Sequence, residues 1–468
     1  MTGPAMGESR NPLFGLGGDA REELVRRMVE RRAGRPAPAG DGGDGFGDSV
    51  PGVPAAATPA AGGGVSEECR RLDRLPGIRE LAVQHQVAAG LGLEIPFFRL
   101  HERVARDTAV IGGREYLNFA SYNYLDCCGH PAVAAAAREA IERYGTSASA
   151  SRPVSGERPP QRDLERALAE LHETEDCAVF VSGWATNVTV LGHLFGARDL
   201  IVHDARIHNS ALQGALLSGA RRLPFAHNDL DALDRLLAEE RPRAERTVVL
   251  VEGIYSMDGD LPDLERLIEI KRRHAAFLMV DEAHSIGVLG ARGFGLGEHF
   301  GVARGEVDVW MGTLSKTLAS CGGYIAGARV LVEYLKHTAP GFLYSVGIAP
   351  PMAAAALAAL ELMKAEPERV AMLRERGRLF LDLAKRAGLD TGRSAGYSVV
   401  PVIVGSSLKS VRLSGALFEH GVNVQPIIHP AVEERAARLR FFICCSHTEE
   451  QIRHTVELTA RELARLGG

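Results

Sequence analysis

Short apolar runs alternate with longer amphipathic segments through the middle of the chain. The runs are CAVFV at 177–181, LIV at 200–202, TVVLV at 247–251, FLMV at 277–280 and VDVWM at 307–311. Their length and lack of polar alternation are typical of strands buried on both faces. Segments of helical length separate them from residue 161 onward. This alternation predicts an α/β fold with a doubly wound, mostly parallel sheet.

The flanking regions show other patterns. A helical pattern covers 69–89, REYLNFASYNYL from 114 predicts a strand entering a turn, and 131–144 predicts a helix. After 349, a helix beginning at two prolines precedes strands within 397–405 and 439–445 and a closing amphipathic helix. We therefore expect an entry segment at 76–130, a large domain at 131–348 and a smaller α/β domain at 349–468.

Residues 1–75 differ in composition from the rest. REELVRRMVERR at 21–32 predicts one short charged helix, and about half of the residues in 34–64 are glycine or proline. A segment of that composition has too few apolar side chains to build a core. We expect a flexible tail that carries one helix.

Composition and charge exclude several classes of function. A formal net charge of −5 gives no electrostatic footprint for nucleic acid. The first ten residues lack the apolar core of a secretory signal, and the apolar run at 346–360 is too short to span a bilayer. The seven cysteines include no CxxC pair and no metal-ligand spacing with histidine. We expect a cytoplasmic protein with no membrane, nucleic-acid or metal partner.

Chemistry-bearing residues follow two of the buried runs. FLMV ends in Asp281 and Glu282, and the run at 307–311 leads to Thr313 and Lys316 within GTLSK. Carboxyl ends of parallel strands are where open α/β sheets bind ligands. A lysine amid hydroxyls and glycine suits an amine nucleophile beside a phosphate, and a carboxylate can keep a pyridine nitrogen protonated. The pair indicates pyridoxal phosphate, although either residue alone would also fit a solvated strand end or a helix cap.

His284 follows Asp281 at a spacing that strengthens this hypothesis. The segments DEAHSIGVLG at 281–290 and GTLSKTLASCGG at 312–323 resemble the aspartate–histidine and lysine motifs of the α-oxoamine synthases, which are fold-type I pyridoxal-phosphate enzymes. The resemblance extends from about Pro96 to the C-terminus through further motifs: SGWATN at 182–187, HDARIHNS at 203–210, EGIYSMDGD at 252–260 and GFLYSVGIAPP at 341–351.

The resemblance assigns roles to residues of the cofactor site. Lys316 would carry the cofactor as a Schiff base and then act as general base, while Asp281 would hold the ring nitrogen protonated. The other expected contacts are with the ring oxygen from His284, Ser256 and Thr313, with the ring face from His208, and with the phosphate from Gly183 and Trp184. Ser345 would reach the phosphate of a neighbouring subunit, which implies an obligate homodimer with shared active sites.

The resemblance also indicates the substrates. The reaction it implies is a decarboxylative condensation of an amino acid with an acyl thioester, giving an α-aminoketone. Asn123 would lie near the acyl group, unless it is a turn asparagine. Arg440 would bind the amino acid's carboxylate, with Arg438 as the weaker candidate. Ser151 and Pro153 replace the threonine and asparagine of aminolevulinate-forming members, which favours L-alanine or L-serine over glycine.

Two departures from the family pattern affect the substrate pocket. Ser149 and Ala150 stand where relatives usually carry paired glycines. Without these glycines we expect either a stiffer loop or a differently shaped acyl pocket. Phe441 and Phe442 stand where many relatives have a small hydroxyl residue soon after the arginine.

The acyl donor is expected to be a carrier-protein thioester, with coenzyme A as a poorer substitute. Residues 96–125 resemble members found in or beside assembly lines, and the charges of Arg26, Arg27, Arg31 and Arg32 would suit the acidic helix of a carrier protein. The tail could equally be an inert extension. A coenzyme A-dependent synthase of primary metabolism, and an aminotransferase or aldolase on the same fold, stay open as well. Lys316, His284 and Asp281 together argue against a non-catalytic subunit.

Overall fold

The computed structural model describes residues 66–467, which form two compact units divided between Phe97 and Phe98. The smaller unit contains two 3₁₀ turns, Glu67–Arg70 and Leu72–Arg74, followed by helix α2, Pro76–Gly90. The helix begins later than the pattern at 69–89 suggested because Pro76 occupies its first position, where a missing N–H has no effect. The helix predicted at 21–32 lies outside the described residues.

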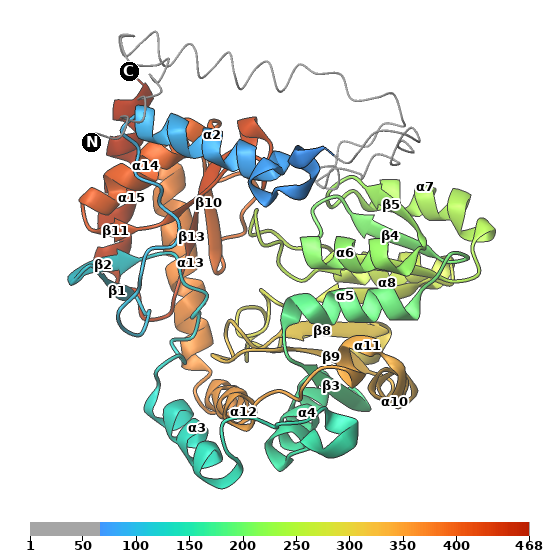
Figure 1. The fold of residues 1–468 in the computed structure, drawn as a ribbon. Coiled ribbons are helices and arrows are strands. Elements are labelled where there is room, and N and C mark those ends of the chain that lie inside the picture. The colour runs from blue at the N-terminus through green and yellow to red at the C-terminus, as the bar shows by residue number, and fades with distance from the viewer. Residues whose placement is uncertain (1–65, 468) are drawn as a thin grey trace, which may run out of the picture. The chain divides into compact units, whose positions relative to one another are not determined.

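A seven-stranded sheet forms the centre of the larger unit, in the order β3-β9-β8-β7-β6-β4-β5 (Figure 1). The strands are β3 (Asp176–Phe180), β4 (Leu200–Asp204), β5 (Arg221–Phe225), β6 (Thr247–Glu252), β7 (Phe277–Asp281), β8 (Val309–Thr313) and β9 (Gly323–Gly327). Neighbours from β8 to β5 pair in parallel, and β9 is antiparallel to both β3 and β8. The predicted α/β class with a mostly parallel sheet is confirmed.

Helices cover both faces of this sheet, so alternate residues of each strand enter two separate cores. In β7, Met279 packs in one core and Leu278 and Val280 in the other. The first face is covered by α5 (Gly183–Leu194), α6 (Asn209–Ser218), α10 (Arg329–Thr338) and α11 (Pro340–Leu343). The second is covered by α4 (Pro159–Leu171), α7 (Leu230–Glu240), α8 (Leu264–Arg273), α9 (Leu296–Phe300) and α12 (Pro350–Ala365).

Two three-stranded sheets join chain segments that are far apart in sequence. One has the order β1-β2-β11 and the other β10-β13-β12. Their strands are β1 (Thr108–Ile111), β2 (Arg114–Asn118), β10 (Val399–Ile403), β11 (Val422–Asn423), β12 (Gln425–Ile427) and β13 (Arg438–Phe442). Because β2 pairs in parallel with β11, the latter half of the expected entry segment is part of the C-terminal region.

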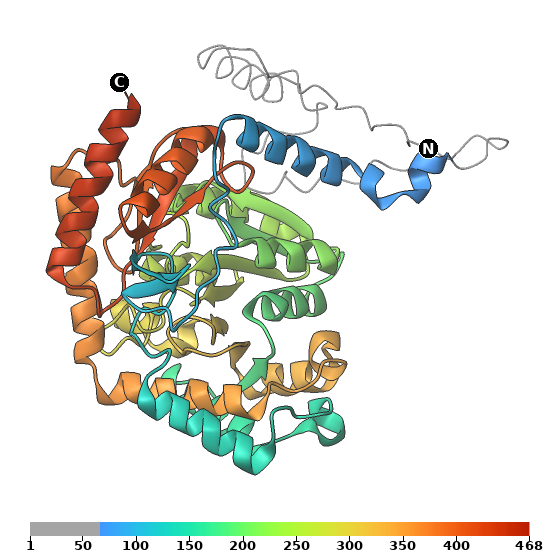
Figure 2. The same ribbon diagram turned by 60° about the vertical axis from the view of Figure 1, so that its left-hand side comes forward.

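The remaining helices flank these elements. Helix α3 spans Pro131–Tyr144, as predicted, and packs against α12. Helices α13 (Glu368–Arg386), α14 (Ser407–Glu419) and α15 (Glu449–Gly467) follow, and α15 contacts both of the others. Figure 2 shows these orange and red helices beside one another. Between residues 66 and 467, no helix has the length and apolar character needed to cross a membrane.

The pair α5 and α6 packs so closely that one position admits only glycine. A Cβ atom on Gly214 of α6 would lie 2.6 Å from the Asn187 carbonyl oxygen and 2.9 Å from the Leu191 Cβ. Both obstacles belong to α5, and the nearer one is backbone, which cannot rotate away. The position of Asn187 therefore depends on this contact.

We expect Gly214→Ala to lower the free energy of unfolding by about 1–3 kcal/mol because it overpacks the contact between α5 and α6. The control is Gly415→Ala in α14, where a Cβ would meet nothing within 4 Å. That substitution should be neutral or raise stability by up to about 1 kcal/mol, since alanine favours a helix interior. Urea denaturation of both variants measures the difference, and equal stabilities would contradict the packing argument.

Candidate active site

The carboxyl ends of β6, β7 and β8 bring polar residues together on one face of the large sheet. Glu252 and Asp281 are direct partners in the parallel register of β6 and β7. Strand alternation places both side chains, together with Thr313 of β8, on the face covered by α5 and α6. Asp281 was expected at a strand end, and the structure adds Glu252 beside it.

Asp281 is buried and held by hydrogen bonds from two sides. Its Oδ2 accepts from Asn187 Nδ2 at 2.9 Å, and its Oδ1 accepts from the Ala283 backbone N–H at 3.0 Å. Asn187 also donates to Ser210 Oγ at 2.9 Å, so residues of α5, α6 and β7 meet at this carboxylate. The role of Asn187 was not predicted from the sequence. Its place one turn after the start of a helix that follows a strand was the available signal.

Lys316 lies half-buried near this carboxylate. Burial lowers the pKa of its amine to about 8, against the opposing charges of Asp281 and Glu252. Its Nζ lies 5.6 Å from the centroid of the Tyr122 ring. An amine with a pKa lowered to that degree can lose its proton near neutral pH and act as a nucleophile or a base.

Glu252 supports the loop that carries Ser256. Its Oε2 accepts a hydrogen bond from the Ser256 backbone N–H at 3.0 Å. Its Oε1 is buried and has no hydrogen-bond partner in the described part of the chain. Burial raises the pKa of Glu252 well above its ordinary value, and the neighbouring Asp281 raises it further. Both causes favour the neutral form of the Glu252 carboxyl.

His284 is buried with one ring nitrogen already bonded. Its Nδ1 lies 2.7 Å from the Tyr124 hydroxyl, a contact between residues 160 positions apart. Burial and the Lys316 charge hold the pKa of His284 well below its ordinary value, so the imidazole is neutral. The turn that carries it is tied down by Glu282, which accepts from the Leu296 backbone N–H at 2.9 Å. Tyr124 was not singled out in the sequence.

The start of α5 lies against the end of β8. A Cβ on Gly183 would be 2.8 Å from Thr313 Oγ1, so this approach requires glycine. Thr313 Oγ1 donates to the Gly322 carbonyl at 3.0 Å and lies 2.8 Å from Ser315 Oγ. Trp184 is half exposed at the first turn. Backbone amides at a helix start, with hydroxyls beside them, are a suitable binding site for a phosphate.

The two candidate arginines of β13 differ in what they already bind. Arg438 is buried and donates to Asp258 at 2.8 Å, to Met257 O at 3.0 Å and to Ala436 O at 2.8 Å. Arg440 donates from Nη1 to Ser256 O at 2.9 Å, but its buried Nε has no hydrogen-bond partner within residues 66–467. Arg440 therefore has donor capacity left for a carboxylate, and Arg438 is fixed by the protein.

Three other predicted residues lie in loops or at helix starts. His208 is exposed at the N-cap of α6, with Nδ1 2.7 Å from Ser210 Oγ. Asn123 is buried in a turn, where it donates to Ala105 O at 3.1 Å and accepts from the Cys128 backbone N–H at 3.0 Å. These bonds favour the turn interpretation of Asn123. Ser151 is half-buried before a turn at Arg152–Gly156.

The loop before Ser151 shows how the missing glycines are accommodated. Ser149 has a φ of 57°, in the left-handed region where a glycine would be relaxed. Holding an L-residue there costs roughly 1–2 kcal/mol. The loop therefore keeps a backbone conformation suited to glycine, although Ser149 lacks the conformational freedom of a glycine.

The residues at this sheet edge fit pyridoxal phosphate. Asp281 offers a buried carboxylate for the ring nitrogen, and Lys316 offers an amine with a lowered pKa. The start of α5 offers amides for the phosphate, and Arg440 leaves Nε for a substrate anion.

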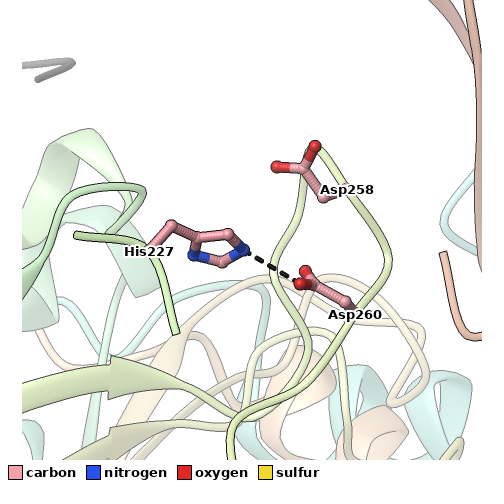
Figure 3. A group of neighbouring side chains, drawn as sticks. All are labelled: His227, Asp258 and Asp260. Atoms are coloured by element: carbon pink, nitrogen blue, oxygen red, sulfur yellow. Dashed lines mark hydrogen bonds and ion pairs between the residues drawn. The ribbon is translucent and has the colours of Figure 1, made fainter. Parts of the chain in front are cut away.

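A second polar cluster lies beside the Ser256 loop (Figure 3). His227, Asp258 and Asp260 bring possible ligand atoms within 4.8 Å of one another. Both His227 nitrogens are already bonded, Nδ1 to Asp204 at 2.9 Å and Nε2 to Asp260 at 2.9 Å. This grouping was not anticipated from the sequence.

The charges of this cluster balance without a metal ion. Asp258 binds Arg206 at 2.7 Å and Arg438 at 2.8 Å. Burial opposes protonation of His227, but hydrogen bonds and charges of Asp204 and Asp260 outweigh it and raise its pKa to about 9. Three carboxylates then face two guanidinium groups and one imidazolium. We interpret the cluster as an ion-pair network that joins the loop after β6 to β13.

We expect the stability of the protein to fall as the pH rises through the His227 range. The pKa of His227 is about 9 in the folded protein and near 6.5 in the unfolded chain. Protonated His227 therefore contributes fully to the free energy of unfolding below pH 6.5, and this contribution is lost as the pH approaches about 9. His227→Gln keeps one hydrogen bond but cannot titrate, so its free energy of unfolding should vary less over that interval. Urea denaturation between these pH values tests this, and parallel curves for both proteins would contradict it.

Comparisons with known proteins agree with the site. Residues 114–458 match the family model of aminotransferases of class I and II. The 8-amino-7-oxononanoate synthase of Symbiobacterium thermophilum is 39% identical over 362 residues, covering 77% of this chain and 92% of that protein. The enzyme of the same name from Geobacter sulfurreducens is 41% identical over 361 residues, covering 76% and 91%.

Solved structures place the fold in the same family. The serine palmitoyltransferase of Sphingomonas wittichii superposes with a TM-score of 0.80 at 27% identity, covering 84% of this chain and 98% of that one. A serine palmitoyltransferase variant from S. paucimobilis with bound PLP and myriocin gives 0.81 at 26% identity, covering 85% and 100%. The chain therefore belongs to the α-oxoamine synthases, pyridoxal-phosphate-dependent acyltransferases within the aminotransferase class I and II family.

Proposed function

We propose that the protein condenses L-alanine or L-serine with an acyl thioester, preferably one borne by a carrier protein, and releases carbon dioxide and a thiol. The observation that carries the amino-acid half is the buried Nε of Arg440, which has no hydrogen-bond partner in the described part of the chain. A guanidinium with a spare donor in a site with Lys316 and Asp281 suits an α-amino acid, which presents a carboxylate beside its amine.

The cofactor supplies an electron sink for the carbanion formed at the amino acid's α-carbon. Lys316 removes and returns protons at that carbon, because its lowered pKa makes the neutral amine available near neutral pH. Asp281, oriented by Asn187, would hold the proton on the ring nitrogen. His284, neutral and fixed by Tyr124, would bind the ring oxygen together with Ser256 and Thr313. His208, exposed at the start of α6, would stack on the ring.

The identity of the amino acid is supported from two sides. The product that names the sequence relatives, 8-amino-7-oxononanoate, contains the two carbons that alanine retains after decarboxylation. The structural neighbours are named for serine. Ser151 in place of a bulkier threonine leaves room for either side chain, and Pro153 supplies no backbone N–H to an acyl carboxylate.

The preference for a carrier protein rests on the sequence of residues 96–125 and on the N-terminal arginines. Arg26, Arg27, Arg31 and Arg32 lie outside the described residues. Their charge would attract an acidic helix, and attachment through a long Gly/Pro segment would raise the local concentration of a docked partner.

We also propose a homodimer with shared active sites. The segment around Ser345 includes Tyr344, which is 86% exposed, and Val346, which is half exposed. Ser345 Oγ makes only a weak contact with the Val346 carbonyl at 3.3 Å. Neighbouring exposed apolar side chains favour burial against another protein surface, here a second copy of the chain.

A second candidate is a coenzyme A-dependent synthase of primary metabolism. Identities of 39% and 41% to two 8-amino-7-oxononanoate synthases favour it. It would use the same residues on the amino acid and differ only in the acyl donor.

Asp281→Asn should retain some cofactor and reduce turnover by about a hundredfold or more, because a charged hydrogen-bond partner worth a few kcal/mol is lost. Lys316→Ala provides the comparison, since it should fold but lose the visible absorbance that depends on the covalent link between Lys316 and the cofactor. Carbon dioxide release and the absorption spectrum measure the two effects. Near-normal turnover in Asp281→Asn would show that this residue only caps the strand end.

The acyl donor is tested by comparing carrier-bound and coenzyme A thioesters with L-alanine, L-serine and glycine in competition. We expect the carrier-bound donor and one of the two larger amino acids to be used best. A chain that starts at Glu67 should lose part of the preference for the carrier. Equal use of both thioesters by both proteins would contradict the carrier proposal, and preference for glycine would contradict the amino-acid proposal. If truncation left the preference for the carrier unchanged, only the docking role of the tail would be excluded.

A further inference from the structure

Two adjacent phenylalanines of β13 lie in different environments. Phe441 is fully buried, with its ring 4.9 Å from that of Phe380 and 5.8 Å from that of Phe119. Successive side chains of a strand point to opposite faces, so Phe442 points away from this cluster. Phe441 belongs to the packing of the C-terminal region, and Phe442 faces the active site.

Phe442 contacts aromatic residues of the site. Its ring centroid is 4.7 Å from that of Tyr122 in an edge-to-face arrangement. It lies 6.3 Å from the Tyr124 ring and 6.4 Å from the His284 imidazole, with which it is nearly parallel. These distances are in or near the range of favourable aromatic pairs. Phe442 is therefore part of the wall that holds His284.

Each of the two rings in edge-to-face contact lies close to a cation. The guanidinium carbon of Arg440 is 4.7 Å from the Phe442 centroid, and Lys316 Nζ is 5.6 Å from the Tyr122 centroid. Both distances are within the range of cation–π attraction, about 6 Å. The Tyr122–Phe442 pair thus lies beside both the amine and the guanidinium of the site.

Arg440 has few other restraints on its guanidinium. Nη1 donates to Ser256 O at 2.9 Å and contacts Met257 Sδ at 3.4 Å, whereas Nε has no bond in the described residues. One well-formed hydrogen bond leaves the plane of a guanidinium free to turn. The Phe442 ring lies 4.7 Å from the guanidinium carbon and restricts this rotation.

We propose that Phe442 is a positioning residue that fixes the guanidinium of Arg440 for the carboxylate of the amino acid. This rests on the proposed function, in which Arg440 binds that carboxylate. A small hydroxyl residue at this position would offer no ring face, whereas Phe442 presents one to the guanidinium.

Loss of the ring should weaken amino-acid binding selectively. A cation–π contact of about 0.7–1.4 kcal/mol corresponds to a roughly three- to tenfold rise in the dissociation constant. An amine without a carboxylate makes no contact with Arg440, so any change in its affinity reports only on the rest of the site. The ratio of the two affinities therefore reports the orientation of Arg440 independently of general damage to the site.

The experiment titrates the full-length, cofactor-loaded enzyme with L-alanine and, separately, with ethylamine, following the cofactor absorbance. Phe442→Leu and Phe442→Met remove the ring, and Phe442→Tyr keeps it. Phe441→Leu is the matched control on the same strand. We expect the ring-deleting variants to lose a factor of about three to ten in the ratio of alanine to ethylamine affinity, and Phe442→Tyr to retain it. Phe441→Leu should lower the melting temperature and leave the ratio unchanged.

An unchanged ratio in the folded ring-deleting variants would overturn the inference. An equal change in Phe441→Leu would also overturn it, since the effect would then come from strand packing. If the wild-type enzyme gave no spectral response to L-alanine or, in the same titration, to L-serine, the proposed function itself would fail, and the inference with it. A response in the wild type with no difference among the variants refutes only the role of Phe442.

Discussion

The hydrogen bond between Asn187 and Asp281 connects the packing of the large sheet to its chemistry. Asp281 is the last residue of β7, and strand alternation turns it toward α5, where Asn187 donates to it at 2.9 Å. The distance between α5 and α6 is set by Gly214, and the same asparagine also binds Ser210 of α6. A buried carboxylate without these donors would be costly to keep ionised. The orientation of the acid therefore depends on how closely two helices pack.

Burial also determines which groups in the site carry charge. Glu252 and Asp281 are adjacent in register, and two ionised carboxylates at that separation would repel each other. The raised pKa of Glu252 favours its neutral form, which reduces this repulsion. The lowered pKa of His284 keeps a second positive charge away from Lys316. The site sets the Asp281 carboxyl against the Lys316 amine, with the neutral His284 and the guanidinium of Arg440 beside them.

A strand or motif could be predicted from the sequence where it depends on residues that are neighbours along the chain. It could not be predicted where it depends on contacts with distant residues. The strands ending at Glu252, Asp281 and Thr313 were evident because each is an apolar run. Strand β9, with the sequence GYIAG, was missed because glycine at both ends weakens the strand pattern and its antiparallel pairing breaks the alternation with helices. Strand β5 was missed because RRLPF, at the edge of the sheet, is charged and contains proline.

The candidate site divides in the same way. The motifs containing Lys316, Asp281 and His284 are contiguous, so their residues were identified from sequence. The bond from Tyr124 to His284 joins residues 160 positions apart, and no local pattern encodes it. Asn123 was given two interpretations, and its bonds to Ala105 and Cys128 favour the turn. The departure at Phe441 and Phe442 was visible, but only strand alternation in three dimensions shows which ring faces the site.

The substrate end of the site depends on a network outside it. Asp258 binds Arg206 and Arg438, so the loop after β6 is attached to β13 by a buried ion pair. The same loop presents the Ser256 carbonyl to Arg440, two residues further along β13. Arg438 and Arg440 point to the same side of the strand. Arg438 holds the loop through Asp258, and Arg440 donates a hydrogen bond to the loop at the Ser256 carbonyl. Because a broken buried ion pair leaves an uncompensated charge, loss of Asp258 would move the carbonyl that positions Arg440. Under the proposed function, the network around His227 would therefore influence substrate binding through the position of this loop.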